Sequence, residues 1–169
     1  MSTNNPMLSL GGIEWTHTTW NPTSGCTAIS SGCAKCYAKK RAEMMQNHPN
    51  PKVADAYRNG FEPTYQPQRL GDPFHWRKPR WIFVNSMSDL FHKTFNEAYI
   101  DAVFGVMNRC PQHKFQVLTK RAERLAEIAP KLKWGDNIYV GVSVENERNM
   151  GRIEHLRKVP TKNRFLSLE

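Results

Sequence analysis

The segment FQVLTKRAERLAEIAPKLKWGDNIYVGVSVEN, residues 115–146, contains two short apolar runs separated by a helical pattern. Residues 115–118 predict a β-strand, residues 121–128 a helix that ends before Pro130, and residues 138–144 a second strand. Two strands joined through a helix are parallel neighbours with a right-handed crossover. The second strand is almost entirely apolar, which is typical of a strand buried on both faces of a sheet.

The same alternation of strand and helix extends in both directions along the chain. Toward the N-terminus we expect a strand at residues 81–84 and, after it, an amphipathic helix at residues 97–108. Toward the C-terminus we expect a helix at residues 145–156 and a strand at residues 165–168. A short strand at residues 13–15 begins the series. The sequence therefore predicts an α/β fold with a parallel sheet of about five strands.

The rest of the chain divides into a tail, a helix and an insertion. Residues 1–12 are polar, and we expect them to form a flexible N-terminal tail. Residues 34–46 are good helix formers. Residues 48–80 are interrupted repeatedly by proline and glycine and contain one helical candidate, at residues 53–58. We therefore expect one domain over residues 13–169 with an irregular insertion at about residues 48–80.

Composition limits the classes of protein to which the chain can belong. The 169 residues carry a net charge of +9 that is spread along the sequence, so the basic character belongs to the folded surface. A polyanionic partner such as DNA, RNA or a nucleotide is one explanation, and a basic soluble protein without such a partner is the other. The sequence has no long apolar run and no signal peptide, so we expect a cytoplasmic protein without a membrane partner.

Three of the four cysteines lie within eleven residues: Cys26, Cys33 and Cys36. Their clustering indicates metal ligation in a reducing compartment more than disulfide formation. A structural zinc site needs a fourth ligand, for which Cys110, His17 and His48 are the candidates. Three thiolates alone suit a [4Fe-4S] cluster with one iron open, so spacing favours iron–sulfur over zinc. A redox dithiol of Cys33 and Cys36 is a third alternative, and we expect Cys110 to be a buried free thiol.

Polar residues follow every predicted strand, where loops at the carboxyl ends of parallel strands line a site. These residues are Asn21; Asn85, Ser86, Ser88, Asp89 and His92; Thr119, Lys120 and Arg121; Glu145 and Asn146; and Glu169. Any one of them has an ordinary alternative role as a turn or capping residue. Their recurrence at five strand ends favours a common site.

Long stretches of the chain resemble a known group of proteins. The stretches are IEWTHTTWNPTSGC, SGCAKCYAKKRAE, WRKPRWIFVNSMSDLFH, FQVLTKRAERL, YVGVSVEN and RFLSLE. In this order they are similar to the phage-associated group of radical S-adenosylmethionine-like proteins, from about Ile13 to the last residue. One departure from the wider superfamily is the spacing of the first two cysteines, which are separated by six residues here instead of three.

The resemblance implies a cofactor set and a reaction. Cys26, Cys33 and Cys36 would hold a [4Fe-4S] cluster whose remaining iron binds S-adenosyl-L-methionine. An electron donor would drive cleavage of that cofactor to a 5'-deoxyadenosyl radical, which abstracts hydrogen from a substrate. The protein would act in the cytoplasm of a host cell if it is encoded by a phage.

The resemblance also implies a barrel. Members of the group resemble (β/α) barrels of about six strands, and their chains usually continue beyond the segment that ends here. The expected fold is therefore an incomplete parallel (β/α) barrel of about five strands, radical-SAM-like. A naturally short form, a second polypeptide that completes the barrel, and a truncated inactive relic are the three explanations.

Placed on this scaffold, the polar residues receive expected roles. Contacts to the methionine moiety or the substrate are expected from Asn85, Ser86 and Asp89, contacts to ribose hydroxyls from Glu145 and Asn146, and substrate contacts from His92, Lys120 and Arg121. The run HWRKPRW, residues 75–81, is a nucleic-acid candidate, although its tryptophans fit core packing somewhat better. We expect a radical S-adenosylmethionine-type enzyme that acts on a nucleic acid or nucleotide. The rival is a non-enzymatic metal-stabilised nucleic-acid-binding module.

Overall fold

A computed structural model describes residues 15–168 of the chain. The predicted flexible tail, residues 1–12, lies outside the described residues, as do Ile13 and Glu14 of the predicted first strand. Trp15 lies in a turn, and the first strand is instead β1 (Thr18–Trp20). The strand forms where the β-branched Thr18 and Thr19 pair with the neighbouring strand.

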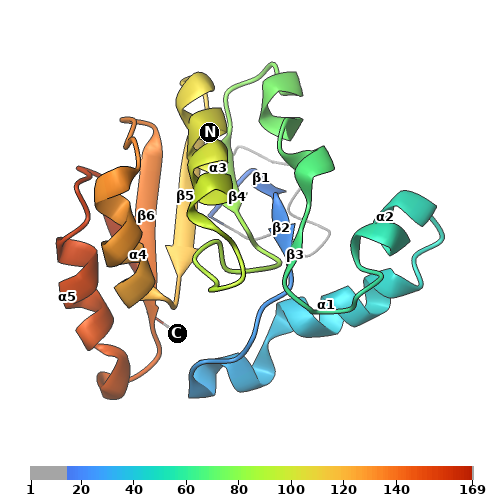
Figure 1. Ribbon diagram of the computed structural model, residues 1–169, viewed down its shortest axis with the longest axis horizontal. Helices are drawn as coiled ribbons and strands as arrows, with labels where there is room; N and C mark the ends of the chain where they lie inside the picture. The colour runs from blue at the N-terminus through green and yellow to red at the C-terminus, as the bar shows by residue number, and fades with distance from the viewer. Residues whose placement is uncertain (1–14, 169) are drawn as a thin grey trace, which may run out of the picture.

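The main sheet has five strands, which confirms the predicted α/β fold with a parallel sheet (Figure 1). The strands are β1, β4 (Trp81–Val84), β5 (Lys114–Thr119), β6 (Ile138–Val144) and β7 (Arg164–Leu168), in that order across the sheet. Every neighbouring pair is parallel. All five carboxyl ends therefore lie along one edge of the sheet.

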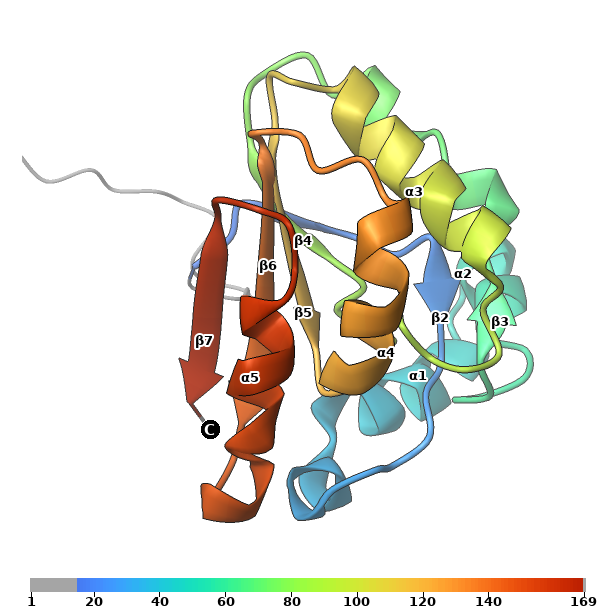
Figure 2. The same ribbon diagram turned by 60° about the vertical axis from the view of Figure 1, so that its left-hand side comes forward.

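Three helices connect these strands and lie on the same face of the sheet: α3 (Glu97–Arg109), α4 (Ala122–Ile128) and α5 (Gly151–Arg157) (Figure 2). The Asn96 side chain caps α3 by accepting a hydrogen bond from the Tyr99 amide. A 3-10 turn, η4 (Ala129–Lys131), follows α4. The predicted helix at residues 145–156 is shorter than expected, because another 3-10 turn, η5 (Glu147–Asn149), precedes α5.

The main hydrophobic core lies between the sheet and these helices. Ile82, Val117 and Val140 from the strands are fully buried against Phe104 and Leu125 from the helices. Cys110, at the end of α3, belongs to the same core and is 1% exposed, so the predicted buried free thiol is confirmed. Burial raises its pKa.

The segments between β1 and β4 form a smaller unit beside the sheet. A 3-10 turn, η1 (Ser31–Lys35), leads into α1 (Tyr37–Gln46), which packs against α2 (Pro51–Ala56). The insertion continues with η2 (Pro67–Arg69) and η3 (Asp72–His75). Strands β2 (Thr23–Ser24) and β3 (Thr64–Tyr65) pair antiparallel. This small ribbon, which the sequence did not predict, ties the insertion to the loop that follows β1.

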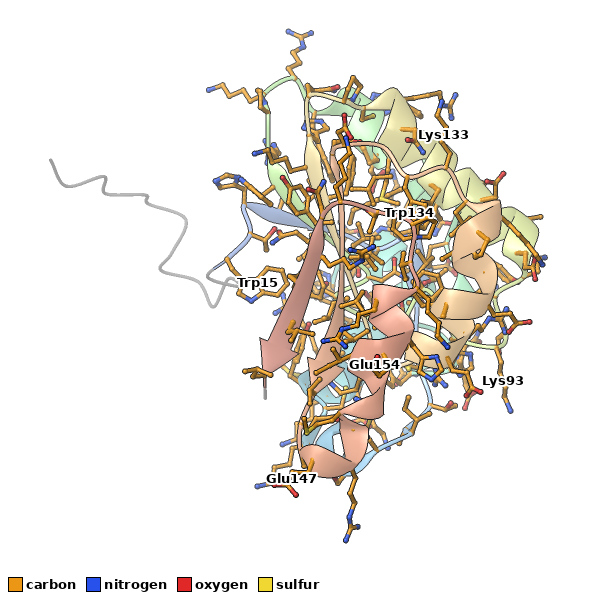
Figure 3. The ribbon with its side chains drawn as sticks, turned by 90° about the vertical axis from the view of Figure 1, so that its left-hand side faces the viewer. Trp15, Lys93, Lys133, Trp134, Glu147 and Glu154 are labelled. Atoms are coloured by element: carbon orange, nitrogen blue, oxygen red, sulfur yellow. The ribbon has the colours of Figure 1, made fainter. Side chains whose placement is uncertain are left out.

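Beneath this unit lies a second core of four buried residues: Ala38, Ala42, Tyr57 and Met87. The opposite face of the main sheet carries Trp15, whose ring lies 4.7 Å from that of Phe83 (Figure 3). In the part of the chain that the structure describes, no helix has the length and apolar character needed to cross a bilayer.

Candidate functional site

The carboxyl-end edge of the sheet brings together the predicted polar residues from four strands. Asn21 follows β1, Asn85 follows β4, Lys120 follows β5, and Glu145 follows β6. Figure 3 shows Lys93 and Glu147 at this end of the molecule and Lys133 at the other. Glu169, predicted to follow β7, lies outside the described residues.

The corner between β1 and β4 is built from buried polar side chains. Asn85 has a positive φ of 62°, a conformation that asparagine tolerates better than most residues. Its Nδ2 donates hydrogen bonds to Thr23 Oγ1 and Ser88 Oγ, while its buried Oδ1 has no hydrogen-bond partner among the described residues. Asn21 Oδ1 accepts from the Met87 amide and from Ser86 Oγ. The corner is therefore a network of hydrogen-bonded polar side chains in which one acceptor, Asn85 Oδ1, has no partner among the described residues.

The cysteine loop, residues 25–36, crosses this edge and is held by its backbone. The Gly25 amide donates to Met87 O, and the Cys26 amide donates to Phe61 O. Gly25 has a φ of 78°, and a Cβ there would lie 2.1 Å from Glu62 O, so only glycine fits. The loop ends at Cys36, the N-cap of α1, whose side chain makes no capping hydrogen bond.

Arg121 holds the first half of the cysteine loop. Its Nη2 donates to Thr27 O at 2.9 Å and lies 3.7 Å from Cys26 Sγ. His92 Nε2 lies 2.8 Å from Thr27 Oγ1. His92 Nδ1 accepts from the Thr94 amide, so Nε2 carries the proton and donates to Thr27. Burial and the nearby Arg121, Lys93 and Arg124 lower the pKa of His92 to about 4, which makes it neutral near pH 7.

The carboxylate of Asp89 forms an ion pair with Arg121. Its carboxylate is buried and accepts from Thr119 Oγ1 at 2.7 Å, from the Phe91 amide and from the Lys120 amide. Arg121 Nε lies 3.9 Å from Asp89 Oδ2. Burial raises the pKa of Asp89, and these donors oppose that shift. The structure thus brings Asp89 and Arg121 together, with both carboxylate oxygens engaged by protein groups.

Glu145 holds the second half of the cysteine loop. Ser30 Oγ donates to Glu145 Oε1 at 2.6 Å, and Lys120 Nζ lies 3.6 Å from the same oxygen. Oε2 accepts from Arg152 Nη1 and Asn149 Nδ2, each at 2.7 Å. Burial alone would raise the pKa of Glu145, but Ser30, Arg152 and Lys120 together lower it below its ordinary value. A Cβ on Gly32 would lie 2.6 Å from Glu145 Cγ, so the loop packs directly on this side chain.

The three loop cysteines are free thiols of intermediate exposure. Burial and the Asp89 charge raise the pKa of Cys26, and the Cys33 thiolate adds to that shift, whereas Arg121 opposes it. Burial alone would raise the pKa of Cys33. Hydrogen bonds from Ile29 and Ser30 and the Lys120 charge outweigh burial, so the pKa of Cys33 is lowered. Cys33 is therefore closer to a thiolate, the form that binds metal.

A site for a single metal ion is not formed by the described residues. No group of three or more histidine, cysteine, aspartate or glutamate side chains within residues 15–168 is arranged to hold one ion. The three candidates for a fourth ligand are engaged elsewhere. His17 Nδ1 accepts from the Trp81 amide at the start of β4, His48 Nδ1 accepts from the Asn50 amide, and Cys110 lies in the main core.

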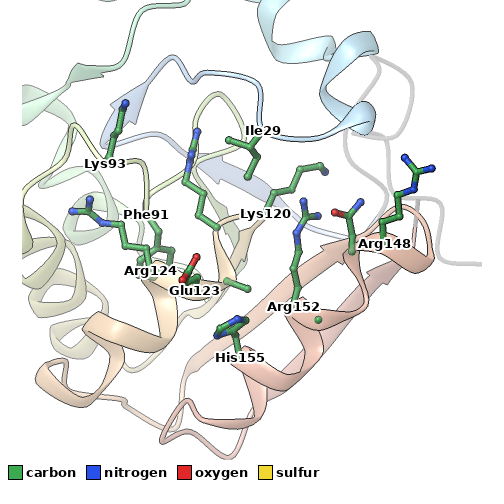
Figure 4. Close-up of a pocket in the computed structure, with 13 residues that line it drawn as sticks. Ile29, Phe91, Lys93, Lys120, Glu123, Arg124, Arg148, Arg152 and His155 are labelled. Atoms are coloured by element: carbon green, nitrogen blue, oxygen red, sulfur yellow. The ribbon is translucent and has the colours of Figure 1, made fainter.

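Two open hollows flank the cysteine loop. One, of about 530 Å³, separates loop residues Ile29, Ser30 and Ser31 from the segment that begins at Asn146. Asn146 Nδ2 donates to Ser31 Oγ at 3.4 Å across it. The other, of about 450 Å³, lies between the loops that precede α4 and α5 (Figure 4). The site therefore offers two solvent-open pockets, both of which are lined in part by Ile29 of the cysteine loop.

The aromatic and basic run at residues 75–81 lies away from this site. Trp76 packs against the main core, with Arg80 over its ring. Trp81 begins β4 at the opposite end of the sheet and contacts Tyr139, with Lys114 Nζ 4.7 Å from its ring centre. These contacts are those of packed tryptophans, the alternative that the sequence favoured. Whether the exposed Arg77 and Lys78 contact nucleic acid stays a prediction.

Several residues of the site were not predicted from the sequence. Thr27 and Ser30 anchor the cysteine loop, and Asn149 and Arg152 anchor Glu145. From the sequence, Thr27 and Ser30 belong to a Ser/Gly-rich span, residues 27–32, that is long enough to bring Cys26 toward Cys33 and Cys36. The signal available was weak: hydroxyl residues placed between cysteines, and an arginine seven residues after Glu145.

Comparison with known proteins places the chain in a family. A family model described as protein of unknown function (DUF5131) matches residues 11–169. No curated protein and no solved structure matched the chain. The family match covers the whole sheet, the cysteine loop and every residue of the site.

Proposed function

The chain belongs to the family described as protein of unknown function (DUF5131), and we propose from its own residues that it is a radical S-adenosylmethionine-type iron–sulfur enzyme of the phage-associated group. We also propose that its sheet is part of a (β/α) barrel. The strands follow chain order across the sheet and the connecting helices share one face, as in such barrels. In a doubly wound sheet the strand order reverses and helices cover both faces.

The observation that carries the proposal is the placement of the three thiols. Cys26, Cys33 and Cys36 are free, half-exposed and carried by one loop across the carboxyl-end edge of a parallel sheet. That loop is held at both halves by the side chains of Arg121 and Glu145. Functional sites of α/β folds gather at this edge.

The donor set fits an iron–sulfur cluster better than a single ion. Soft thiolates are the usual ligands of such clusters. A single tetrahedral ion would need ligands that converge on one point, an arrangement that the described residues do not offer. Cys36 also stands at the N-terminus of the ten-residue helix α1, where backbone amides favour negative charge.

When bound, a [4Fe-4S] cluster with one open iron supplies the site for S-adenosyl-L-methionine and the electron for its cleavage to a 5'-deoxyadenosyl radical. The chain's residues position the loop. Arg121 lies 3.7 Å from Cys26 Sγ, where its charge favours the thiolate. Ser30 links the Cys33 turn to Glu145. We assign Glu145 and Asp89 to positioning, because protein groups bond their oxygens, and Asn146, which lines the hollow beside the loop, to contacting the cofactor.

The proposal is tested by anaerobic reconstitution of the full chain with iron and sulfide. We expect a brown protein whose electron paramagnetic resonance spectrum changes when S-adenosyl-L-methionine is added, and formation of 5'-deoxyadenosine under reducing conditions without added substrate. Cys33→Ser should lose the cluster and the product. Cys110→Ser is the matched control, because this thiol lies in the core away from the loop, and it should retain both.

Two outcomes would contradict the proposal. A colourless protein that holds stoichiometric zinc would favour a metal-stabilised binding module instead. A cluster that survives in Cys33→Ser but is lost in Cys110→Ser would place the iron elsewhere in the chain.

A further inference from the structure

The pocket between the loops that precede α4 and α5 is strongly basic. Its lining includes six lysine or arginine side chains: Lys93, Lys120, Arg121, Arg124, Arg148 and Arg152. His155 also lines it, and Glu123 is its one carboxylate. Figure 4 shows Lys93 and Arg124 on one side of the pocket and Arg148 and Arg152 on the other. The positive charge therefore surrounds the space instead of lying on one wall.

Internal ion pairs neutralise only part of this charge. Glu145 pairs with Lys120 and Arg152, and Asp89 lies near Arg121; both carboxylates are buried behind the pocket. Within residues 15–168, the side chains of Lys93 and Arg148 form no ion pair or hydrogen bond. Counting the two buried carboxylates and Glu123, the lining cations still outnumber the anions two to one. A group with more than one negative charge would balance the excess.

Two arginine side chains of the pocket are held in place by protein groups: Arg121 Nη2 donates to Thr27 O, and Arg124 is held in the same way. Arg124 Nη2 donates to Phe95 O at 2.7 Å, which fixes the guanidinium, yet its buried Nε has no hydrogen-bond partner in the described part of the chain. The buried Nε of Arg121 likewise makes no hydrogen bond there. Planar guanidinium donors match phosphate oxygens in geometry and charge. Two held arginines in one basic pocket indicate a phosphate ligand.

The volume and the apolar residues of the pocket indicate the size of that ligand. The pocket volume of about 450 Å³ falls in the range of small-molecule sites. Ile29, from the cysteine loop, and Phe91 give it an apolar part next to the cations. We propose that this pocket binds a small phosphorylated molecule of nucleotide size through its phosphate groups. The further statement that this molecule is the enzyme's substrate rests on the proposed function, because Ile29 joins the pocket to the cysteine loop.

The test measures binding by isothermal titration calorimetry to the full chain without added iron. The probes are inorganic triphosphate, ATP and a single-stranded oligonucleotide. We expect ATP to bind at low salt, to weaken as salt rises because ions screen the contacts, and to bind at least as well as triphosphate. Lys93→Gln and Arg148→Gln, from opposite walls, should each weaken ATP binding, and the double variant should weaken it about tenfold or more.

Lys158→Gln removes an exposed charge from the end of α5, outside the pocket, and should change the affinity less than about twofold. The pocket assignment fails if ATP does not bind at low salt or if Lys158→Gln weakens it as much as the double variant does. Much tighter binding of the oligonucleotide than of ATP would overturn the small-molecule ligand. Cys33→Ser should bind ATP normally, so a failure of the iron–sulfur proposal leaves this result distinguishable.

Discussion

At the scale of single residues, the carboxylate of Glu145 is held by four side chains of the protein. It joins Ser30 of the cysteine loop to Lys120, Asn149 and Arg152. Removing one partner of a buried ionic network leaves the others desolvated and unpaired. We predict that Glu145→Ala lowers the free energy of unfolding by about 3 kcal/mol in urea denaturation at pH 7. Glu147→Ala, at an exposed neighbouring position, should change it by less than about 0.5 kcal/mol.

The pH dependence of this difference follows from the lowered pKa of Glu145. A carboxylate whose folded pKa lies below its unfolded value stabilises the fold above the unfolded pKa, and that stabilisation disappears as pH falls through the folded pKa. The gap between wild type and Glu145→Ala should therefore shrink as the solution becomes more acidic than the usual glutamate pKa. A gap that stays constant down to strong acid would show that the lost contacts are not ionic.

His92 gives a second prediction about pH, for a base that is neutral in the folded protein instead of a charged carboxylate. Its folded pKa of about 4 lies below the usual value of 6.5, so the unfolded chain takes up a proton first as pH falls. Between pH 7.5 and pH 5 this residue should cost the fold about 2 kcal/mol, and His92→Gln should remove that component. Urea denaturation at the two pH values measures it. His75→Gln, at an exposed position, should leave the pH dependence as in the wild type.

At the scale of elements, two glycines differ in whether the backbone around them leaves room for a side chain. Gly25, at positive φ against the Glu62 carbonyl, has no room for a side chain. We predict that Gly25→Ala destabilises the protein by about 3 kcal/mol. Gly105 lies inside α3 with no atom within 4 Å of an added Cβ, so Gly105→Ala should stabilise the protein by about 0.5–1 kcal/mol. Thermal unfolding of both variants checks the two signs, and a neutral Gly25→Ala would refute the close approach.

The elements also show what could be predicted from sequence. The strands at residues 81–84 and 138–144 were predicted at their exact bounds, because each is an apolar run between clear breakers. The first described strand begins at Thr18, after the predicted residues 13–15, of which Ile13 and Glu14 lie outside the described residues. Strands β2 and β3 have two residues each, too few to show a period, and they are joined only by a pairing distant in sequence. Local pattern has no access to such a contact.

For the candidate site, the positions of the residues could be predicted from the sequence, but their hydrogen-bond partners could not. The position of polar residues after parallel strands predicted that Asn85, Lys120, Arg121 and Glu145 would share one edge, since topology alone requires it. The partners of these residues could not be predicted. Ser30 and Glu145 are 115 positions apart, and nothing local in either segment specifies their hydrogen bond. The expected contacts of the site residues with a cofactor remain predictions.

At the scale of the whole molecule, stability is distributed unevenly between two cores. The main core spans the sheet and helices α3, α4 and α5, whereas α1 and α2 rest on only four buried residues. Local opening is easiest where few apolar contacts are lost. We predict that backbone amides of α1 exchange with deuterium well before those of β5 and β6, as mass spectrometry of peptic fragments measures. Equal protection of α1 and β6 would show that the two units unfold together.

The anchors of the cysteine loop bear on the order of assembly. Thr27, Ser30 and Gly25 of this segment are each held by hydrogen bonds to protein groups at or near the carboxyl-end edge of the sheet. For the proposed cluster, these contacts favour a loop that folds first and takes up iron and sulfide in a separate, later step. Loss of the proposed cluster to oxygen would then be reversible by loading the same folded loop again, without a new round of translation.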